Sequence, residues 1–63
     1  MNLIPVSSSA IAAIGYETGI LAVAFHQSGV YYHPGVPYAV YVGLMQAQSK
    51  GAYYNRYIRG RYR

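Results

Sequence analysis

The side chains with the most chemical potential in this 63-residue chain lie at its C-terminal end. All five basic residues fall within the last fourteen positions, and tyrosines are interspersed among them. Cations can contact phosphates and aromatic rings can stack on bases, a combination typical of proteins that bind single-stranded nucleic acid. We therefore predict a nucleic-acid-binding surface, with RNA as the expected partner, made of Lys50, Tyr53, Arg56, Tyr57, Arg59, Arg61 and Arg63.

This basic segment has two interpretations. On a helix, Arg56 and Arg59 are i, i+3 neighbours and Tyr53 and Tyr57 are i, i+4 neighbours, so cations and rings could share one surface. Alternatively, the tyrosines pack on a sheet while the arginines keep a short helix soluble and complement its C-terminal dipole. The sequence is compatible with both.

A second candidate site is an aromatic platform formed by Tyr31 and His33. If the loop before their strand has two residues, both side chains lie opposite the Phe25 face and form an exposed platform of the kind on which sheets stack bases. If the loop has three residues, the parity changes and both join Phe25 in the core. The sequence leaves this register open.

Catalysis and metal binding have few side chains available. Glu17 is the only acidic residue, whereas glycosidases and aspartic proteases need two carboxylates. His26 and His33 have no cysteine or aspartate to complete a zinc site, which usually takes three or four protein ligands. We expect no enzymatic activity, no metal and no other cofactor.

The composition indicates one small basic module. A chain this short buries only about 60% of the surface that its unfolded state exposes, so its stability should be marginal. No cysteine is present to form a disulfide, and the formal net charge is +4. The longest apolar stretches, 10–14 and 20–25, are shorter than the roughly 20 residues that cross a bilayer. We expect a cytoplasmic protein that binds neither a membrane nor a small-molecule substrate.

Three segments are typical of β-strands: 10–16, 20–26 and 30–33. The second alternates larger apolar side chains with alanine, and the third is rich in β-branched and aromatic residues. Polar, glycine-containing segments at 17–19 and 27–29 separate the three and are typical of hairpin turns. The predicted fold is therefore α+β, beginning with a three-stranded antiparallel meander.

Two helices should follow the strands. Pro37 fixes a backbone angle suited to the first turn of a helix, and an apolar stripe follows at helical spacing, formed by Val36, Val40, Leu44 and Ala47. Ser49 can cap a second, short helix that extends to Ile58, in which Tyr54 and Ile58 form an i, i+4 apolar pair. Gly60 should end it. We expect the first helix to cover one face of the sheet.

One series of residues runs through nearly the whole chain from Ser8 onward and carries a family resemblance. Its members are Ser8-Ser9, Ile14-Gly15-Tyr16, Tyr31, Val36-Pro37, Tyr41, Leu44, Ala47, Ser49, Gly51, Tyr53-Tyr54-Asn55, Ile58-Arg59-Gly60 and Tyr62. The series resembles the KTSC domain family, which is named for a segment at the C-terminus of some lysyl-tRNA synthetases and also occurs as small free-standing bacterial proteins. That family typically carries a Tyr-x-Tyr pair in the third strand, where this chain has Tyr31 and His33.

The serines that follow Pro5 predict a loosely ordered lead over residues 1–8. The resemblance adds a single KTSC-like domain over residues 9–63. It carries no established activity to this chain, although RNA binding has been put forward for the family because of its synthetase neighbours. Together with the basic C-terminus, this favours a small non-enzymatic, RNA-binding module. The alternative is a protein-interaction or homo-oligomerisation module whose exposed tyrosines form a self-complementary patch, since Tyr and Arg are enriched at interface hot spots.

Overall fold

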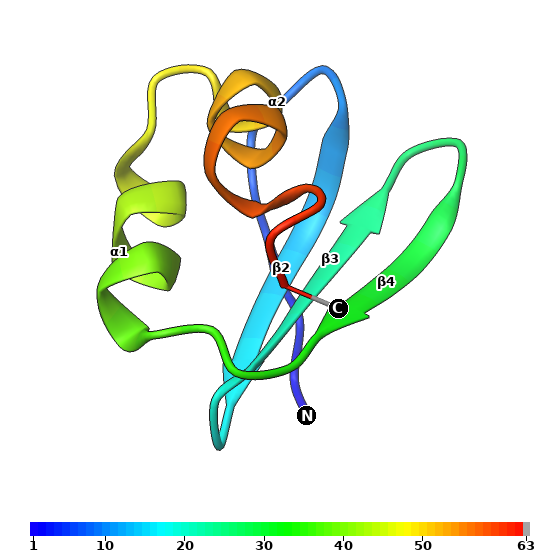
Figure 1. Ribbon diagram of the computed structural model, residues 1–63. Helices are drawn as coiled ribbons and strands as arrows, with labels where there is room; N and C mark the ends of the chain where they lie inside the picture. The colour runs from blue at the N-terminus through cyan, green and yellow to red at the C-terminus, as the bar shows by residue number, and fades with distance from the viewer. Residues whose placement is uncertain (63) are drawn as a thin grey trace.

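The computed structural model describes residues 1–62, which form a sheet and three short helical segments (Figure 1). In chain order the elements are β1 (Ile4–Pro5), β2 (Ile11–Glu17), β3 (Ile20–Phe25), β4 (Gly29–His33), α1 (Tyr38–Gln46), α2 (Lys50–Tyr53) and the π-helix η1 (Tyr54–Ile58). The strands form one antiparallel sheet in the order β1-β2-β3-β4, and the helices lie on one side of it. The predicted α+β class is confirmed.

The sheet contains four strands, so the prediction of three is wrong. The three expected strands are β2, β3 and β4, and the additional strand β1 comes from the N-terminal lead, where Ile4 pairs with Ile14 and Pro5 with Ala13. A strand of two residues is too short to show the alternation of apolar and polar residues by which strands are recognised in a sequence. Its place in the sheet is set by the strand with which it pairs. The division between a lead over 1–8 and a domain over 9–63 stays a prediction.

Two different turns connect the three long strands. Glu17 pairs with Ile20, so Thr18 and Gly19 alone form the first turn, and both have positive φ angles, 53° and 77°. Positive φ at both central residues is the requirement of the type I′ hairpin turn, whose twist matches that of the strands. In the second hairpin Phe25 pairs with Gly29, which leaves a three-residue loop over 26–28. This loop length decides the register of β4.

The helices begin and end close to the predicted positions. Pro37 is the N-cap of α1, one residue before the helix begins. The Ser49 hydroxyl accepts a hydrogen bond from the Ala52 amide at 3.4 Å, which confirms Ser49 as the cap of the second helix. The helix η1 ends at Ile58, two residues before Gly60, which adopts a φ of 80° in the turn that follows. None of the helices within residues 1–62 is long and apolar enough to cross a membrane.

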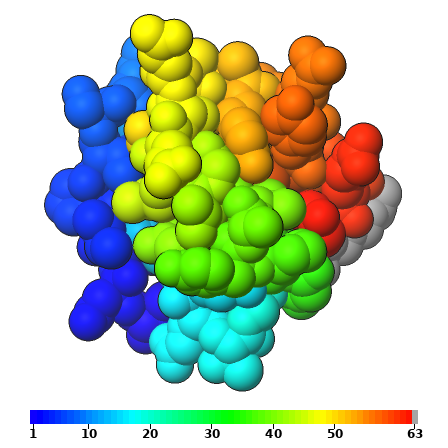
Figure 2. Space-filling view, turned by 90° about the vertical axis from the view of Figure 1, so that its left-hand side faces the viewer, coloured from blue at the N-terminus to red at the C-terminus, as the bar shows by residue number. Residues whose placement is uncertain are grey.

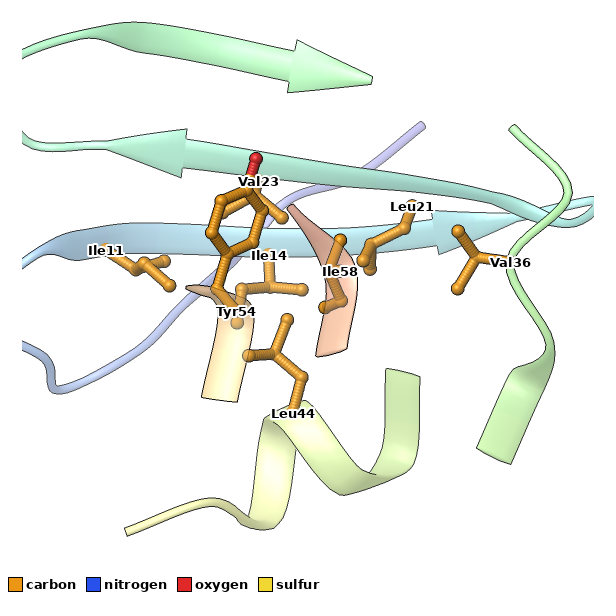
Figure 3. Packing of buried hydrophobic residues seen from close by; sticks show 8 residues of the cluster. All are labelled: Ile11, Ile14, Leu21, Val23, Val36, Leu44, Tyr54 and Ile58. Carbon is orange, nitrogen blue, oxygen red and sulfur yellow. The ribbon is translucent and has the colours of Figure 1, made fainter. Parts of the chain in front are cut away.

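The core lies between the sheet and the helices (Figure 3). Leu44 points from α1 toward the sheet, and Tyr54 and Ile58 of η1 lie in the same layer. All three are buried, as the predicted apolar stripe and the i, i+4 pair require. The complete buried cluster is Ile11, Ile14, Leu21, Val23, Val36, Leu44, Tyr54 and Ile58.

The two ends of the chain lie on different sides of the helical layer. Figure 2 shows the helices covering the face toward the viewer, with the first residues (blue) at one side and the last residues (red) at the other.

The outer face of the sheet is covered by the N-terminal residues. Because Ile14 faces the core, its neighbour Gly15 faces away from it. A Cβ atom on Gly15 would lie 2.7 Å from Cδ2 of Leu3, so the N-terminal residues cover this outer face of the sheet.

Candidate functional site

An open groove lies between β4 and the chain segment that follows η1. It consists of two adjoining hollows of about 250 and 340 Å³, which share Tyr31, Tyr54 and Arg59 as lining residues. The smaller hollow extends to Phe25 and Ser28, and the larger one extends along the C-terminal segment. This feature, termed the β4 groove, brings an aromatic strand and one cation of the basic C-terminus together.

The register of β4 places Tyr31 on the groove side of the sheet. Tyr31 pairs with Val23 and His33 with Leu21, so both side chains point to the same face as the buried residues of β3. The three-residue alternative of the sequence interpretation is therefore the one that the fold adopts. Tyr31 nevertheless remains 47% exposed, because it lies at the open side of the core. Its ring packs edge-on against Phe25, with centroids 5.5 Å apart.

His33 is a buried connector and not a member of an exposed platform. The side chain is only 8% exposed, and both ring nitrogens make hydrogen bonds of 2.8 Å. Because the Tyr62 carbonyl can only accept, Nδ1 must donate to it, and the neutral ring then accepts at Nε2 from the Tyr54 hydroxyl. The proposed Tyr31 and His33 platform is thus wrong for His33, which instead ties the C-terminal segment to β4.

The Tyr54 hydroxyl, which is hydrogen-bonded to His33, has a shifted pKa. Burial raises the pKa of Tyr54 above its usual value of 10.0, and the positive charge of Arg59 opposes part of this rise. Tyr54 therefore stays protonated and donates to His33 under ordinary conditions. The opposing effect of Arg59 agrees with its position in the β4 groove.

Arg59 reaches the groove because the helix stops before it. The π-helix η1 ends at Ile58, and Arg59 has φ and ψ angles of −59° and 125°, which are not helical. The expectation that Arg56 and Arg59 are neighbours on one helical face is therefore wrong. Helix termination directs the chain toward β4, where Arg59 lines both hollows with Tyr31.

Arg56 and two tyrosines, Tyr53 at the end of α2 and Tyr57 in η1, form a separate cluster. The Arg56 guanidinium carbon lies 5.6 Å from the centroid of the Tyr57 ring, and the Tyr53 and Tyr57 centroids are 4.7 Å apart. A Cβ atom on Gly43 would collide with the Tyr53 hydroxyl, so Gly43 permits a close approach of this tyrosine to α1. Tyr53 is committed to packing, and Arg56 already contacts the Tyr57 ring.

The remaining cations differ in what they contact. The Lys50 ammonium donates a 3.1 Å hydrogen bond to the Ala47 carbonyl just after α1. Arg61 is exposed, and Arg63 lies outside the described residues. Glu17 lies at the β2–β3 turn, 3.6 Å from the N-terminal ammonium. Within residues 1–62, Glu17 thus forms its ion pair with the N-terminus and not with a Lys or Arg side chain.

Both histidines use ring nitrogens in contacts within the fold. The His26 Nε2 atom lies 2.9 Å from the Ser8 carbonyl, while His33 uses both of its nitrogens within the fold. Within residues 1–62, no three His, Cys, Asp or Glu side chains come together in a way that could hold a metal ion.

The β4 groove offers one guanidinium, hydroxyl groups and aromatic faces, a set suited to binding an anionic, aromatic ligand.

The sequence interpretation identified Tyr31 and Arg59 but assigned them to two separate sites. The structure brings them to one groove, buries His33 and packs the partly exposed Tyr53 against Gly43. The glycine at position 29, with a φ of 85°, is the sequence signal that could have indicated the three-residue loop. No local pattern marks Ser28 as a lining residue.

The match to a family model and the match to a solved structure give the same family. The KTSC domain model matches residues 7–62. A protein from Tsukamurella paurometabola is 39% identical, and the match covers 94% of this chain and 91% of the relative. The crystal structure of a KTSC domain protein from Yersinia pestis superposes with a TM-score of 0.95 at 36% identity, over 98% of this chain and 90% of that one. These matches indicate no family of enzymes.

Proposed function

The chain belongs to the KTSC domain family, and from this premise we propose that it is a non-enzymatic module that binds single-stranded RNA in the β4 groove. The observation that carries the proposal is the pairing of Arg59 with the half-exposed ring of Tyr31 along one groove. In this proposal Arg59 contacts a phosphate and a base stacks on Tyr31. Each contact has a different physical signature, which allows the two to be tested separately.

Charge distribution supports this location for a polyanion. Every Lys and Arg side chain belongs to the last fourteen residues, and the single acidic side chain, Glu17, is located at the β2–β3 turn beside the N-terminal ammonium. A phosphate that approaches the C-terminal segment therefore meets cations without a neighbouring acidic side chain. Long-range attraction of this kind accelerates association and weakens as salt is added.

The position of Tyr31 favours it over Tyr57 as the stacking residue. Arg56 lies over the Tyr57 ring, so a base would have to displace an existing cation–π contact. The edge-on packing of Phe25 against Tyr31 holds that ring in place and leaves it half-exposed beside Arg59. A ring held in place loses little conformational freedom when a ligand stacks on it.

Fluorescence anisotropy with short labelled single-stranded RNA, measured over a series of salt concentrations, tests the proposal. Up to five phosphate contacts imply a slope of log affinity against log salt no steeper than about −3.5. We expect Tyr31→Ala to lower the affinity by about 5- to 150-fold with an unchanged slope, because stacking releases no ions. Arg59→Gln should lower the affinity and flatten the slope by about 0.7.

Two matched controls separate the groove from general basicity. Arg61→Gln removes the same charge as Arg59→Gln from an exposed position outside the groove lining and should cost less affinity. Tyr38→Ala removes a tyrosine that is more exposed than Tyr31 from the start of α1 and should leave binding unchanged. Equal losses for Arg59→Gln and Arg61→Gln, with no effect of Tyr31→Ala, would contradict binding in the β4 groove. DNA of the same sequence shows whether the ribose contributes.

A further inference from the structure

The two edges of the sheet differ in how they are protected. At one edge β1 has only two residues, of which one is Pro5, and short length and proline are both devices that prevent edge-to-edge pairing. At the other edge β4 has five residues with an uninterrupted register against β3. Figure 1 shows no further element beyond β4 within the described residues. The outer backbone groups of β4 are therefore open to a partner strand.

β4 also lacks the charges that usually protect an edge. No Lys, Arg, Asp or Glu occurs between Glu17 and Lys50, so neither β4 nor its flanking loops carries one. On the face turned away from the helices, Val30 is 43% and Tyr32 is 61% exposed. A long, uncharged edge strand with exposed apolar side chains is a site for pairing with another strand.

We propose that β4 pairs antiparallel with β4 of a second copy of this chain, about a two-fold axis at Tyr31. In this register Val30 lies opposite Tyr32 of the partner subunit, and the same pair recurs on the other side of the axis. Pairs of β-branched and aromatic residues are favourable across antiparallel strands. The result is a continuous eight-stranded sheet, with four strands from each copy.

A second copy fits this edge better than an unrelated charged segment does. Self-pairing brings no like charges opposite each other, because the strand is uncharged, and it satisfies the same row of backbone groups on both copies. A domain of this size also gains from any added buried surface, since its own core is small. The argument for this pairing does not rest on RNA binding, although Tyr31 takes part in both and the pairing would place the two β4 grooves side by side.

Sedimentation equilibrium of the full chain, from micromolar to millimolar concentration, tests the pairing directly. We expect a monomer–dimer equilibrium that persists or strengthens as salt is raised, because apolar contacts and backbone hydrogen bonds carry it. Val30→Lys should shift the dissociation constant upward by about tenfold or more, since the two introduced ammonium groups and two lost apolar pairs act together. A wild-type chain that stays monomeric at millimolar concentration overturns the proposal.

The matched control is Ile4→Lys, which places the same charge at a similarly exposed apolar position on the opposite edge of the sheet. It should leave the dimer intact. If Ile4→Lys dissociates the dimer and Val30→Lys does not, the β4 interface is wrong. Heteronuclear NMR spectra of both variants confirm that each is folded before it is compared.

A cysteine test checks the register independently of any effect on folding. The natural chain contains no cysteine, so a single introduced thiol can form a disulfide only with its counterpart in another copy. Residue 31 faces itself across the proposed axis, at a separation that a disulfide spans, whereas residue 30 faces residue 32. Tyr31→Cys should therefore form a disulfide dimer about tenfold faster than Val30→Cys. Equal rates, or a faster Val30→Cys, overturn the register and with it the proposal.

Discussion

Besides the Tyr53 and Tyr57 pair, residues 1–62 contain two clusters of packed aromatic rings on the sheet. Near the β2–β3 turn, the Tyr16 ring stacks on Tyr41 at 5.0 Å and meets Tyr38 edge-on at 5.7 Å. At the other end Phe25 meets Tyr31 and Tyr54 edge-on at 5.5 and 5.0 Å. The first set is termed the α1 cluster and the second the groove cluster. The groove cluster also includes His33, which lies nearer the β2–β3 turn and meets the Tyr54 ring at 5.4 Å.

The two clusters use similar side chains in different ways. In the α1 cluster the Tyr16 hydroxyl donates a 2.6 Å hydrogen bond to the Val36 carbonyl, so the ring fixes the chain that leads into α1. In the groove cluster the fixed rings, Tyr54 and Phe25, support a half-exposed Tyr31 beside Arg59. A high tyrosine content therefore does not by itself indicate a binding site. The residues packed around each ring decide whether that ring stays accessible to a ligand.

The largest expected effect is the loss of the core that supports both clusters. Leu44→Ala should lower the free energy of unfolding by roughly 2 to 5 kcal/mol, because the side chain is fully buried between α1 and the sheet. In a domain of marginal stability this leaves the chain largely unfolded. Urea denaturation followed by circular dichroism measures it. Gln46→Ala, an exposed position of the same helix, should change the value by less than about 0.5 kcal/mol.

The next effect concerns the groove cluster alone. His33→Phe keeps a ring of similar size but leaves the Tyr54 hydroxyl and the Tyr62 carbonyl without their partner, at a cost of about 1 to 3 kcal/mol. Chemical-shift changes in residues 59–62 should accompany the loss, since His33 ties that segment to β4. His26→Phe removes one hydrogen bond at an exposed site and should cost less. Equal costs would mean that the His33 bonds contribute nothing specific.

A third effect tests whether Tyr53 is a packing residue. Replacing glycine by alanine within a helix normally stabilises it by about 1 kcal/mol. Gly43→Ala should instead destabilise the domain by about 1 to 3 kcal/mol, because the new methyl group collides with Tyr53. Thermal unfolding of both single variants and of the double variant with Tyr53→Ala gives the coupling energy. If Gly43→Ala stabilised the domain, Tyr53 would not be packed against α1 and its ring would be available to a ligand.

The smallest effect sharpens the comparison between the clusters. Tyr16→Phe removes only the hydrogen bond to the Val36 carbonyl and should cost about 0.5 to 1.5 kcal/mol of stability. RNA affinity should not change, which is the opposite of the pattern expected for Tyr31→Ala. The two variants are measured by urea denaturation and by anisotropy on the same preparations. Weaker RNA binding by Tyr16→Phe would show that the α1 cluster also takes part.

The sequence by itself determined the elements whose causes are local. The first turn lies in the predicted segment 17–19, where Gly19 adopts the expected positive φ, and the short C-terminal helix follows from the Ser49 cap and from the spacing of Tyr54 and Ile58. Thr18 is β-branched and adopts its positive φ against its own preference, so the two-residue form of the turn is set by the pairing of Glu17 with Ile20. These features depend on backbone preferences and on spacing within a few residues. The same kind of reasoning identified Leu44 as a core residue.

Only the tertiary structure decided the relations between distant segments. One residue of loop length placed His33 in the core and left Tyr31 at its open side, because side chains alternate between the faces of a strand. The end of η1 at Ile58 moved Arg59 away from Arg56 and into the groove of Tyr31, which lies 28 positions earlier (59 − 31). Local patterns hold no information on such pairs, because each contact depends on how two separate elements pack against each other.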